Sequence, residues 1–305
     1  GEYFSIVLLG IPFVLIYNVA AALLRAEGNS QVTFHSVAVA TVINVILDVL
    51  FIVHLGWGVK GGAAATVIAQ FVSMVIALVP LFKSKIFTGD LSYWRLEASL
   101  LKQMINLWLP MFVNSAVITI GGSFVSRNVN AIGPYFTAGI SSGTKIFTML
   151  ESLIMAIQTG LSVFIGQNLG AGLKDRVKRG QHQVVLFGLT LAFVLNILVQ
   201  SLAPVLVGMF LSPSDPLYAQ TLHVAVADVR VITLGMFIMA PMYLYRIAIQ
   251  TLGHPKYPMY AGFLQLLARV FSVSVLPVFI GEYGYYVATV LAWVVTLPIV
   301  MIPYY

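Results

Sequence analysis

Apolar stretches recur along this chain from one end to the other, and each is long enough to cross a lipid bilayer, which takes about 20 residues. Charged residues make up only 9% of the 305 residues, whereas soluble domains carry roughly 25%. Most of the charge lies in short segments between the apolar stretches, which argues against a soluble protein with one apolar core. The alternating segments of about 10 residues that are typical of membrane barrels do not occur. The sequence therefore predicts an all-α integral membrane protein.

About nine transmembrane helices are expected, separated by segments rich in Gly, Pro, Asn and charge. They are predicted at residues 5–26, 33–53, 62–82, 103–126, 134–165, 183–211, 218–252, 258–280 and 284–305. Lys and Arg favour the cytoplasmic side of a membrane, and one set of alternate loops holds ten of them, against only Lys60 and Arg127 in the other set. We expect a multi-pass protein of the cell (inner or plasma) membrane. Its predicted cytoplasmic loops are 25–32, 83–102, 166–182 and 253–257.

The side chains that catalysis or tight metal binding would need are missing or scattered. The chain has no cysteine, and its five histidines lie far apart without ligand spacing. No Ser–His, His–His or Asp–Asp pair lies at helical spacing within an apolar stretch, so we expect neither an enzyme nor a cofactor. The net charge of +6 reflects the basic loops, and we expect the lipid bilayer and a small-molecule substrate as partners, with no nucleic acid and no obligate protein partner.

An internal repeat organises the chain. The segment GVKGGAAATVIA at 58–69 returns as GEYGYYVATVLA at 281–292, with a constant offset of 223. Upstream, with a slip of two residues, Gly28 aligns with Gly253 and Asn44 with Arg269. Each unit is three helices in the same orientation, a parallel repeat known among secondary transporters. Three helices precede the second copy and none precedes the first, so we expect nine helices of a twelve-helix protein, with three missing at the N-terminus.

Several motifs resemble the multidrug and toxic compound extrusion (MATE) family, in particular its DinF-like branch. They are LRAEGN at 24–29, NVILD at 44–48, GWGVKG at 56–61, ATVIAQ at 65–70 and GQNLGAG at 166–172. The resemblance implies two six-helix lobes around a central cavity and alternating access driven by Na⁺ or H⁺. It implies an antiporter that exports organic compounds, cationic or amphiphilic and drug-like. Residues 1–82 would be the rest of the N-terminal lobe, 83–102 a cytoplasmic amphipathic linker, and 103–305 the C-terminal lobe.

Four polar side chains in the first repeat are candidates for cation coupling. Asn44 and Asp48 lie four residues apart and so share a helix face, and the depths of Thr66 and Asn18 match theirs. A carboxylate, two amides and a hydroxyl form an oxygen-rich set that could hold Na⁺ at Asp48, Asn44 and Thr66, or tune a proton site. The resemblance agrees, although it also implies an aspartate on a first helix that this chain does not contain. Interhelical hydrogen bonding is the alternative role.

A second group of residues is predicted to line a substrate cavity. It comprises Tyr17, Lys145, Met149, Glu151 and Arg269. Methionines offer the adaptable surface that promiscuous binding favours, while the charged members either face the cavity or form structural ion pairs. The NorM-like branch of the family carries a glutamate in the stretch that matches 110–115 (PMFVNS), and its lack here argues against a cation site in the C-terminal lobe.

Two other functions compete with export. A lipid-linked oligosaccharide flippase would share the two-lobe plan but is expected to show more basic residues around its cavity. A receptor or scaffold would give no reason for the repeat.

Overall fold

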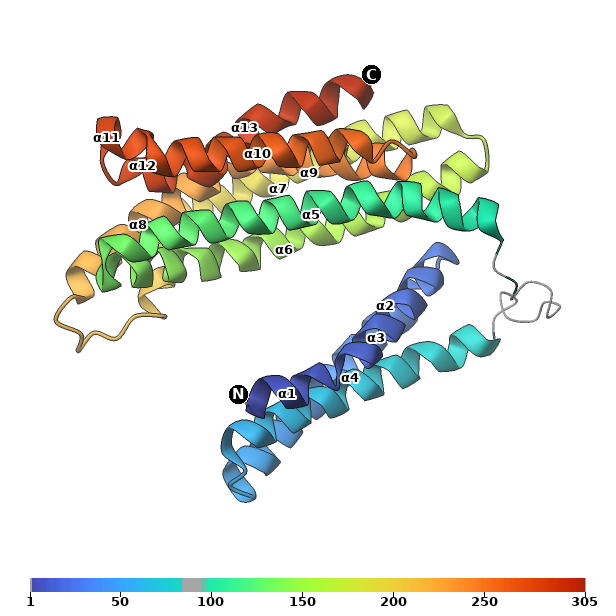
Figure 1. The fold of residues 1–305 in the computed structure, drawn as a ribbon, viewed down its shortest axis with the longest axis horizontal. Helices are drawn as coiled ribbons and strands as arrows, with labels where there is room; N and C mark the ends of the chain where they lie inside the picture. Colours follow the sequence, from blue (N-terminus) through green and yellow to red (C-terminus); the bar gives the residue numbers. More distant parts are fainter. Residues whose placement is uncertain (1, 84–94, 96, 305) are drawn as a thin grey trace. The chain divides into compact units, whose positions relative to one another are not determined.

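The computed structural model describes residues 2–83, 95 and 97–304, and every regular element in these ranges is helical. Six helices are long and apolar enough to cross a membrane, or seven if one bent pair is a single span. The prediction of an all-α membrane protein is confirmed (Figure 1). Helices occupy all nine predicted segments, but the last two are interrupted and fall outside those six or seven.

The chain divides into two compact units, Gly1–Leu96 and Glu97–Tyr305. The first unit contains α1 (Glu2–Leu8), α2 (Ile11–Ala26), α3 (Ser30–Asp48), the π-helix η1 (Val49–His54) and α4 (Gly58–Lys83). α4 packs against α1, α2 and α3. The core of this first unit is built from small and branched apolar side chains, which include Ala20, Leu24, Ala77 and Leu81.

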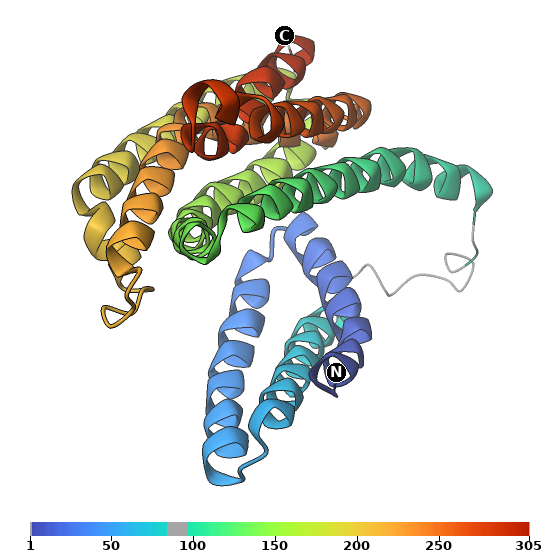
Figure 2. The same ribbon diagram turned by 60° about the vertical axis from the view of Figure 1, so that its left-hand side comes forward.

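The second unit is larger. Its elements are α5 (Ala98–Ile132), α6 (Pro134–Gly170), α7 (Lys174–Gly208), α8 (Tyr218–Leu234), α9 (Met236–Thr251), α10 (Lys256–Ser274), α11 (Leu276–Ile280), α12 (Tyr283–Tyr286), α13 (Ala288–Met301) and the 3-10 helix η4 (Ile302–Tyr304). α6 packs against α7, α8 and α9, while α10 lies between α5 and α13 (Figures 1 and 2). The main core gathers Ile154, Met236, Met239, Met242 and Trp293.

Several helices are longer than the apolar stretches that predicted them. α6 ends at Gly170 and α7 begins at Lys174, so most of the predicted loop 166–182 is helical. Its Lys and Arg residues are good helix formers that stay exposed. α5 likewise begins at Ala98, inside the segment predicted as an amphipathic linker, while residues 84–94 and 96 of that linker lie outside the described residues.

The internal repeat is visible in the backbone. Gly28 and its counterpart Gly253 have φ of 85° and 89°, and Gly58 and Gly281 have φ of 55° and 59°. Only glycine adopts this left-handed conformation readily, so the aligned glycines make the same turns in both copies. The sequence repeat is therefore also a structural one.

The glycine that follows three residues later also has one role in both copies. A Cβ atom on Gly61 would lie 3.1 Å from the carbonyl oxygen of Phe51, and a Cβ on Gly284 would lie 2.6 Å from the backbone nitrogen of Pro277. In each copy of the repeat, the glycine near the start of the helix packs directly against the backbone of the preceding segment. This contact leaves no room for a side chain at the glycine.

Candidate functional site

A small cavity in the first unit brings two of the predicted cation-site residues together. Asn44 of α3 and Thr66 of α4 both line a cavity of about 210 Å³, together with Thr41, Gln70 and Ser73. The Asn44 amide nitrogen is buried without a hydrogen-bond partner, while the Thr66 hydroxyl donates to the carbonyl of Gly62 at 2.9 Å. The cavity is lined by amide and hydroxyl oxygens of the kind that hard cations prefer.

Asp48 lies one turn beyond Asn44, at the end of α3, and is half-buried. One carboxylate oxygen lies 3.7 Å from the position that a Cβ on Gly62 would take, so Asp48 approaches the part of α4 to which Thr66 is bonded. The π-helix η1 follows immediately, and such segments are rare and often occur at functional sites. Asp48, Asn44 and Thr66 thus lie on two helices that pack against each other, although Asp48 is not among the residues that line the cavity.

The other two predicted residues of this unit lie differently. Asn18 is exposed on α2, and its amide donates to the carbonyl of Val14 in its own helix at 2.8 Å. It is not among the residues that line the cavity. Tyr17 is half-buried and packs against the apolar core of the unit.

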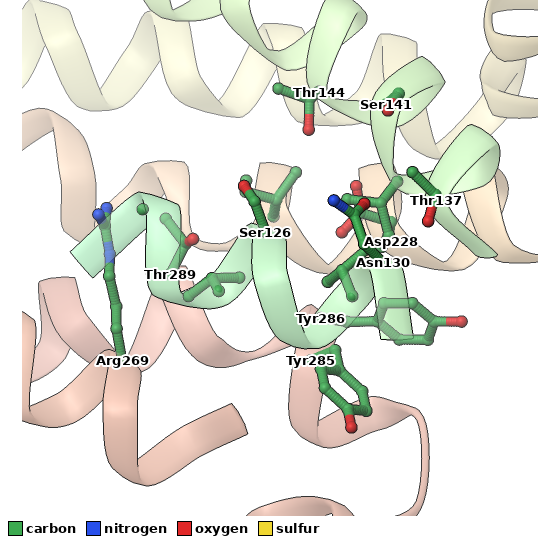
Figure 3. A pocket seen from close by; sticks show the side chains of 15 residues that line it. Ser126, Asn130, Thr137, Ser141, Thr144, Asp228, Arg269, Tyr285, Tyr286 and Thr289 are labelled. Carbon is green, nitrogen blue, oxygen red and sulfur yellow. The ribbon is translucent and has the colours of Figure 1, made fainter. Parts of the chain in front are cut away.

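A larger and more polar cavity of about 420 Å³ lies within the second unit (Figure 3). Its polar lining comes from α5, α6, α8, α10, α12 and α13, namely Ser126, Asn130, Thr137, Ser141, Thr144, Asp228, Arg269, Tyr285, Tyr286 and Thr289. Figure 3 shows Arg269 and Asp228 far apart in this set, with Ser126 and Thr289 between them in that view. The cavity therefore offers a carboxylate and a guanidinium group separated by hydroxyls.

Asp228 is the residue that the sequence analysis missed. It is only 6% exposed, and its Oδ2 atom is buried without a hydrogen-bond partner. A carboxylate inside a membrane helix is costly and generally marks a pathway or a binding site. Asp228 interrupts the apolar segment predicted at 218–252, so this rule applied to that helix would have found it.

Glycine allows the Asp228 carboxylate to approach α6 closely. A Cβ on Gly143 would lie 2.5 Å from Oδ2 of Asp228. One turn earlier on α6, a Cβ on Gly139 would lie 2.6 Å from Val224 and 3.0 Å from the carbonyl oxygen of Thr221 on α8. Two glycines four residues apart let membrane helices pack at short distance, and here they bring the carboxylate to the cavity wall.

The charged residues predicted for the substrate cavity do not pair with one another within the second unit as described. Glu151 accepts a hydrogen bond from the hydroxyl of Tyr243 at 2.6 Å. The ammonium group of Lys145 lies 5.2 Å from the centre of the Phe210 ring. Arg269 donates to the carbonyl of Ile118 at 3.2 Å and lines the cavity. Met149 is exposed on α6.

The two cavities use equivalent positions of the repeat. Asn44 and Thr66 line the first cavity, and their counterparts Arg269 and Thr289 line the second. The repeated helices thus place one polar pair at a cavity in each unit, with an amide in one unit and a guanidinium in the other.

Comparison with known proteins shows relatives named as multidrug resistance or multidrug export proteins. The chain is 27% identical over 230 residues to the probable multidrug resistance protein YoeA of Bacillus subtilis. The aligned region covers 72% of this chain and 49% of YoeA. It is 24% identical over 211 residues to the multidrug export protein MepA of Staphylococcus saprophyticus, covering 69% of this chain and 47% of MepA. The chain thus spans about half the length of these curated relatives.

Solved structures share the fold at low sequence identity. A MOP superfamily transporter from Pyrococcus furiosus superposes with a TM-score of 0.89 at 19% identity, covering 99% of this chain and 68% of that one. A MATE transporter of Vibrio cholerae gives a TM-score of 0.89 at 17% identity, covering 99% and 68%.

The MatE family model matches residues 110–274, from α5 to the end of α10. This match covers more than half of the chain, including Asp228, Glu151 and Arg269. The chain therefore belongs to the MatE family, the multidrug and toxic compound extrusion transporters.

Proposed function

We propose that this chain forms the transport pathway of a secondary active antiporter, which exports organic compounds in exchange for Na⁺ or H⁺. Relatives named as a probable multidrug resistance protein and a multidrug export protein support the class of substrate. The observation that carries the proposal is the buried Asp228 carboxylate, whose unpartnered oxygen lies at a cavity lined by hydroxyls. A carboxylate that lacks a protein partner within membrane helices is suited to bind and release a cation.

The residues around Asp228 fit either coupling ion. Oxygen atoms of Asn130, Thr137 and Ser141 line the same cavity, and Na⁺ is a hard cation that prefers oxygen ligands. A proton would need only the carboxylate, with the hydroxyls as hydrogen-bond donors to its charged form. Within the described residues, no group of three or more His, Cys, Asp or Glu side chains is placed to hold a metal ion.

Asp48, Asn44 and Thr66 form a second proposed cation site, in the first unit. The shared cavity of Asn44 and Thr66 supports it, and Asp48 supplies the charge. We keep Asn18 in this proposal only as a peripheral member, because its amide is engaged with its own helix.

Replacing Asp48 by Asn tests the first-unit site. The change keeps the shape of the side chain and removes its charge, so we expect the apparent affinity for the coupling ion to fall by about 5- to 150-fold, the usual range of a coupling free energy of about 1–3 kcal/mol. Initial efflux rates at increasing Na⁺ or H⁺ concentration measure this affinity. Glu27→Gln, at an exposed residue after α2, is the matched control. If the Asp48 variant has the same apparent affinity for the coupling ion as the wild type, the proposed cation site in the first unit is ruled out.

The proposed activity is tested with the natural protein that carries this sequence, reconstituted in liposomes. We expect efflux of a cationic dye when a Na⁺ or an H⁺ gradient is imposed, and none when both gradients are collapsed. The gradient that drives efflux identifies the coupling ion. Lack of dye movement under either gradient, with the protein correctly inserted, would refute the export function.

The flippase alternative has no observation in its favour. Arg269 is the basic residue among those lining the 420 Å³ cavity, whereas a lipid-linked oligosaccharide is expected to need several. We further propose the plasma membrane as the location, with the basic loops in the cytoplasm and the lipid bilayer and a small-molecule substrate as partners.

A further inference from the structure

Arg246 of α9 is a buried cation with free hydrogen-bond donors. It is 8% exposed, and its Nε and Nη2 atoms have no hydrogen-bond partner. The ring of Tyr243 lies beside it, with its centre 5.8 Å from the guanidinium carbon. An unpaired charge in a membrane protein interior is costly, and such a residue is normally accompanied by a partner.

The two free atoms are on the same edge of the guanidinium group. Nε and Nη2 point their hydrogens in nearly the same direction, and this edge accepts the two oxygens of a carboxylate or a phosphate in parallel hydrogen bonds. The free edge of Arg246 therefore has the geometry of an anion-binding fork.

Arg269 of α10 adds a second guanidinium group with a free donor. Its Nη1 donates a hydrogen bond to the carbonyl oxygen of Ile118, but its Nε has no hydrogen-bond partner. Its side chain lies alongside Gly121 and Gly122 of α5, where a Cβ on either glycine would be in ordinary van der Waals contact with it, at 3.4 Å and 3.8 Å. Arg246 and Arg269 form a cluster of two arginines. Because Arg269 lines the 420 Å³ cavity, this cluster is reached from that cavity through Arg269.

The charges of this cluster do not cancel. Arg246 lies beside the ring of Tyr243, whose hydroxyl donates to Glu151. The helix of Arg246, α9, contacts the helix of Arg269, α10. Glu151 is the acidic member, and one of its oxygens already accepts the Tyr243 hydroxyl. Two cations and one anion leave one positive charge in excess. A ligand with one anionic group would complete the set.

We infer that Arg246 and Arg269 form a subsite that binds the carboxylate or phosphate group of the exported compound. The inference rests on the proposed export function for the identity of the ligand, but the anion-binding chemistry of the subsite does not depend on it. The repeat supports this specialisation, because Arg269 replaces the amide of Asn44 at the equivalent position. One cavity then offers an anion subsite at Arg269 and a free carboxylate at Asp228.

The test uses two probes that share a fluorophore and differ in charge. Dansylglycine carries a carboxylate, and dansylcadaverine carries an ammonium group. Binding of each to the detergent-solubilised 305-residue chain is followed by the rise in dansyl fluorescence. Because no gradient and no transport are involved, failure of this inference is distinguishable from failure of the export function.

We expect Arg246→Met to weaken dansylglycine binding by about tenfold or more, as the loss of a charge-assisted pair predicts, and to leave dansylcadaverine binding within about twofold. Arg269→Gln should act in the same direction. Arg127→Gln, at an exposed arginine of α5, is the matched control and should change neither. Unchanged dansylglycine affinity in both cluster variants would overturn the inference.

Thermal stability separates a binding role from a structural one. Replacing a buried unpaired arginine with an apolar side chain of similar length is often neutral or stabilising, so Arg246→Met should melt at or above the temperature of the wild type. A large fall in melting temperature, together with loss of both probes, would assign Arg246 a structural role and overturn the inference.

Competition identifies the source of the anionic group. Displacement of dansylglycine by acetate or inorganic phosphate supports a soluble ligand. Displacement by phosphatidylglycerol in mixed micelles, with no effect of acetate or phosphate, would assign the subsite to a lipid headgroup and overturn its role in binding an exported compound.

Discussion

Replacing Asp228 by Asn is expected to slow gradient-driven efflux strongly while leaving the protein folded. The substitution keeps the size of the side chain, so the close packing of α8 against Gly143 is retained, but it removes the charge that would bind the coupling cation. Loss of a coupling free energy of about 1–3 kcal/mol lowers the rate by about 5- to 150-fold at subsaturating ion concentration. The measurement is the initial rate of dye efflux from proteoliposomes.

The control for this prediction is Asp175→Asn. Asp175 is exposed in the first turn of α7 and does not line the cavity, so its variant should transport like the wild type. Melting curves of both variants show whether the fold is retained. Normal efflux by a folded Asp228→Asn protein would exclude Asp228 as a coupling residue and leave the first-unit site at Asp48 as the candidate.

The largest effect on stability is expected from Gly139→Val. A Cβ at this position would lie 2.6 Å from Val224 and 3.0 Å from a backbone oxygen of α8, and backbone cannot move aside as a flexible side chain can. Overpacking of a tight contact generally destabilises by about 1–3 kcal/mol and sometimes by more. Because α6 and α8 pack closely along this face, we expect a value at or above the upper end of that range.

Gly160→Val is the matched control, since it makes the same substitution in the same helix. A Cβ on Gly160 has no neighbour within 4 Å, so any change in helix propensity is shared by the two variants while the clash is not. Thermal melting in detergent should show a marked fall for Gly139→Val and little change for Gly160→Val. Equal melting temperatures would show that α6 and α8 do not approach each other as described.

The sequence was sufficient for the fold class and for the positions of the helices. Apolar stretches of bilayer length leave the backbone no alternative but helix, because unpaired polar groups are too costly in hydrocarbon. Helix ends were less well predicted, since the segment from Lys174 to Arg179 is polar yet helical. Charge marks where a stretch leaves the hydrocarbon, whereas the helix continues until a glycine such as Gly172, with φ of 76°, ends it.

The residues of the candidate sites were also predictable from the sequence only in part. The spacing of Asn44 and Asp48 places them on one face of α3, and the repeat pairs Thr66 with Thr289, so the sequence by itself determined which side chains share a face and which positions are equivalent. Only the tertiary structure decided which of them share a cavity. It joined Asn44 with Thr66, gave Glu151 and Arg269 different hydrogen-bond partners, and revealed Asp228 and Arg246 as buried groups with unpartnered atoms. The physical reason is that burial and hydrogen bonding depend on contacts between helices far apart in the chain, and these contacts form where glycines such as Gly139 and Gly143 let two helices come close.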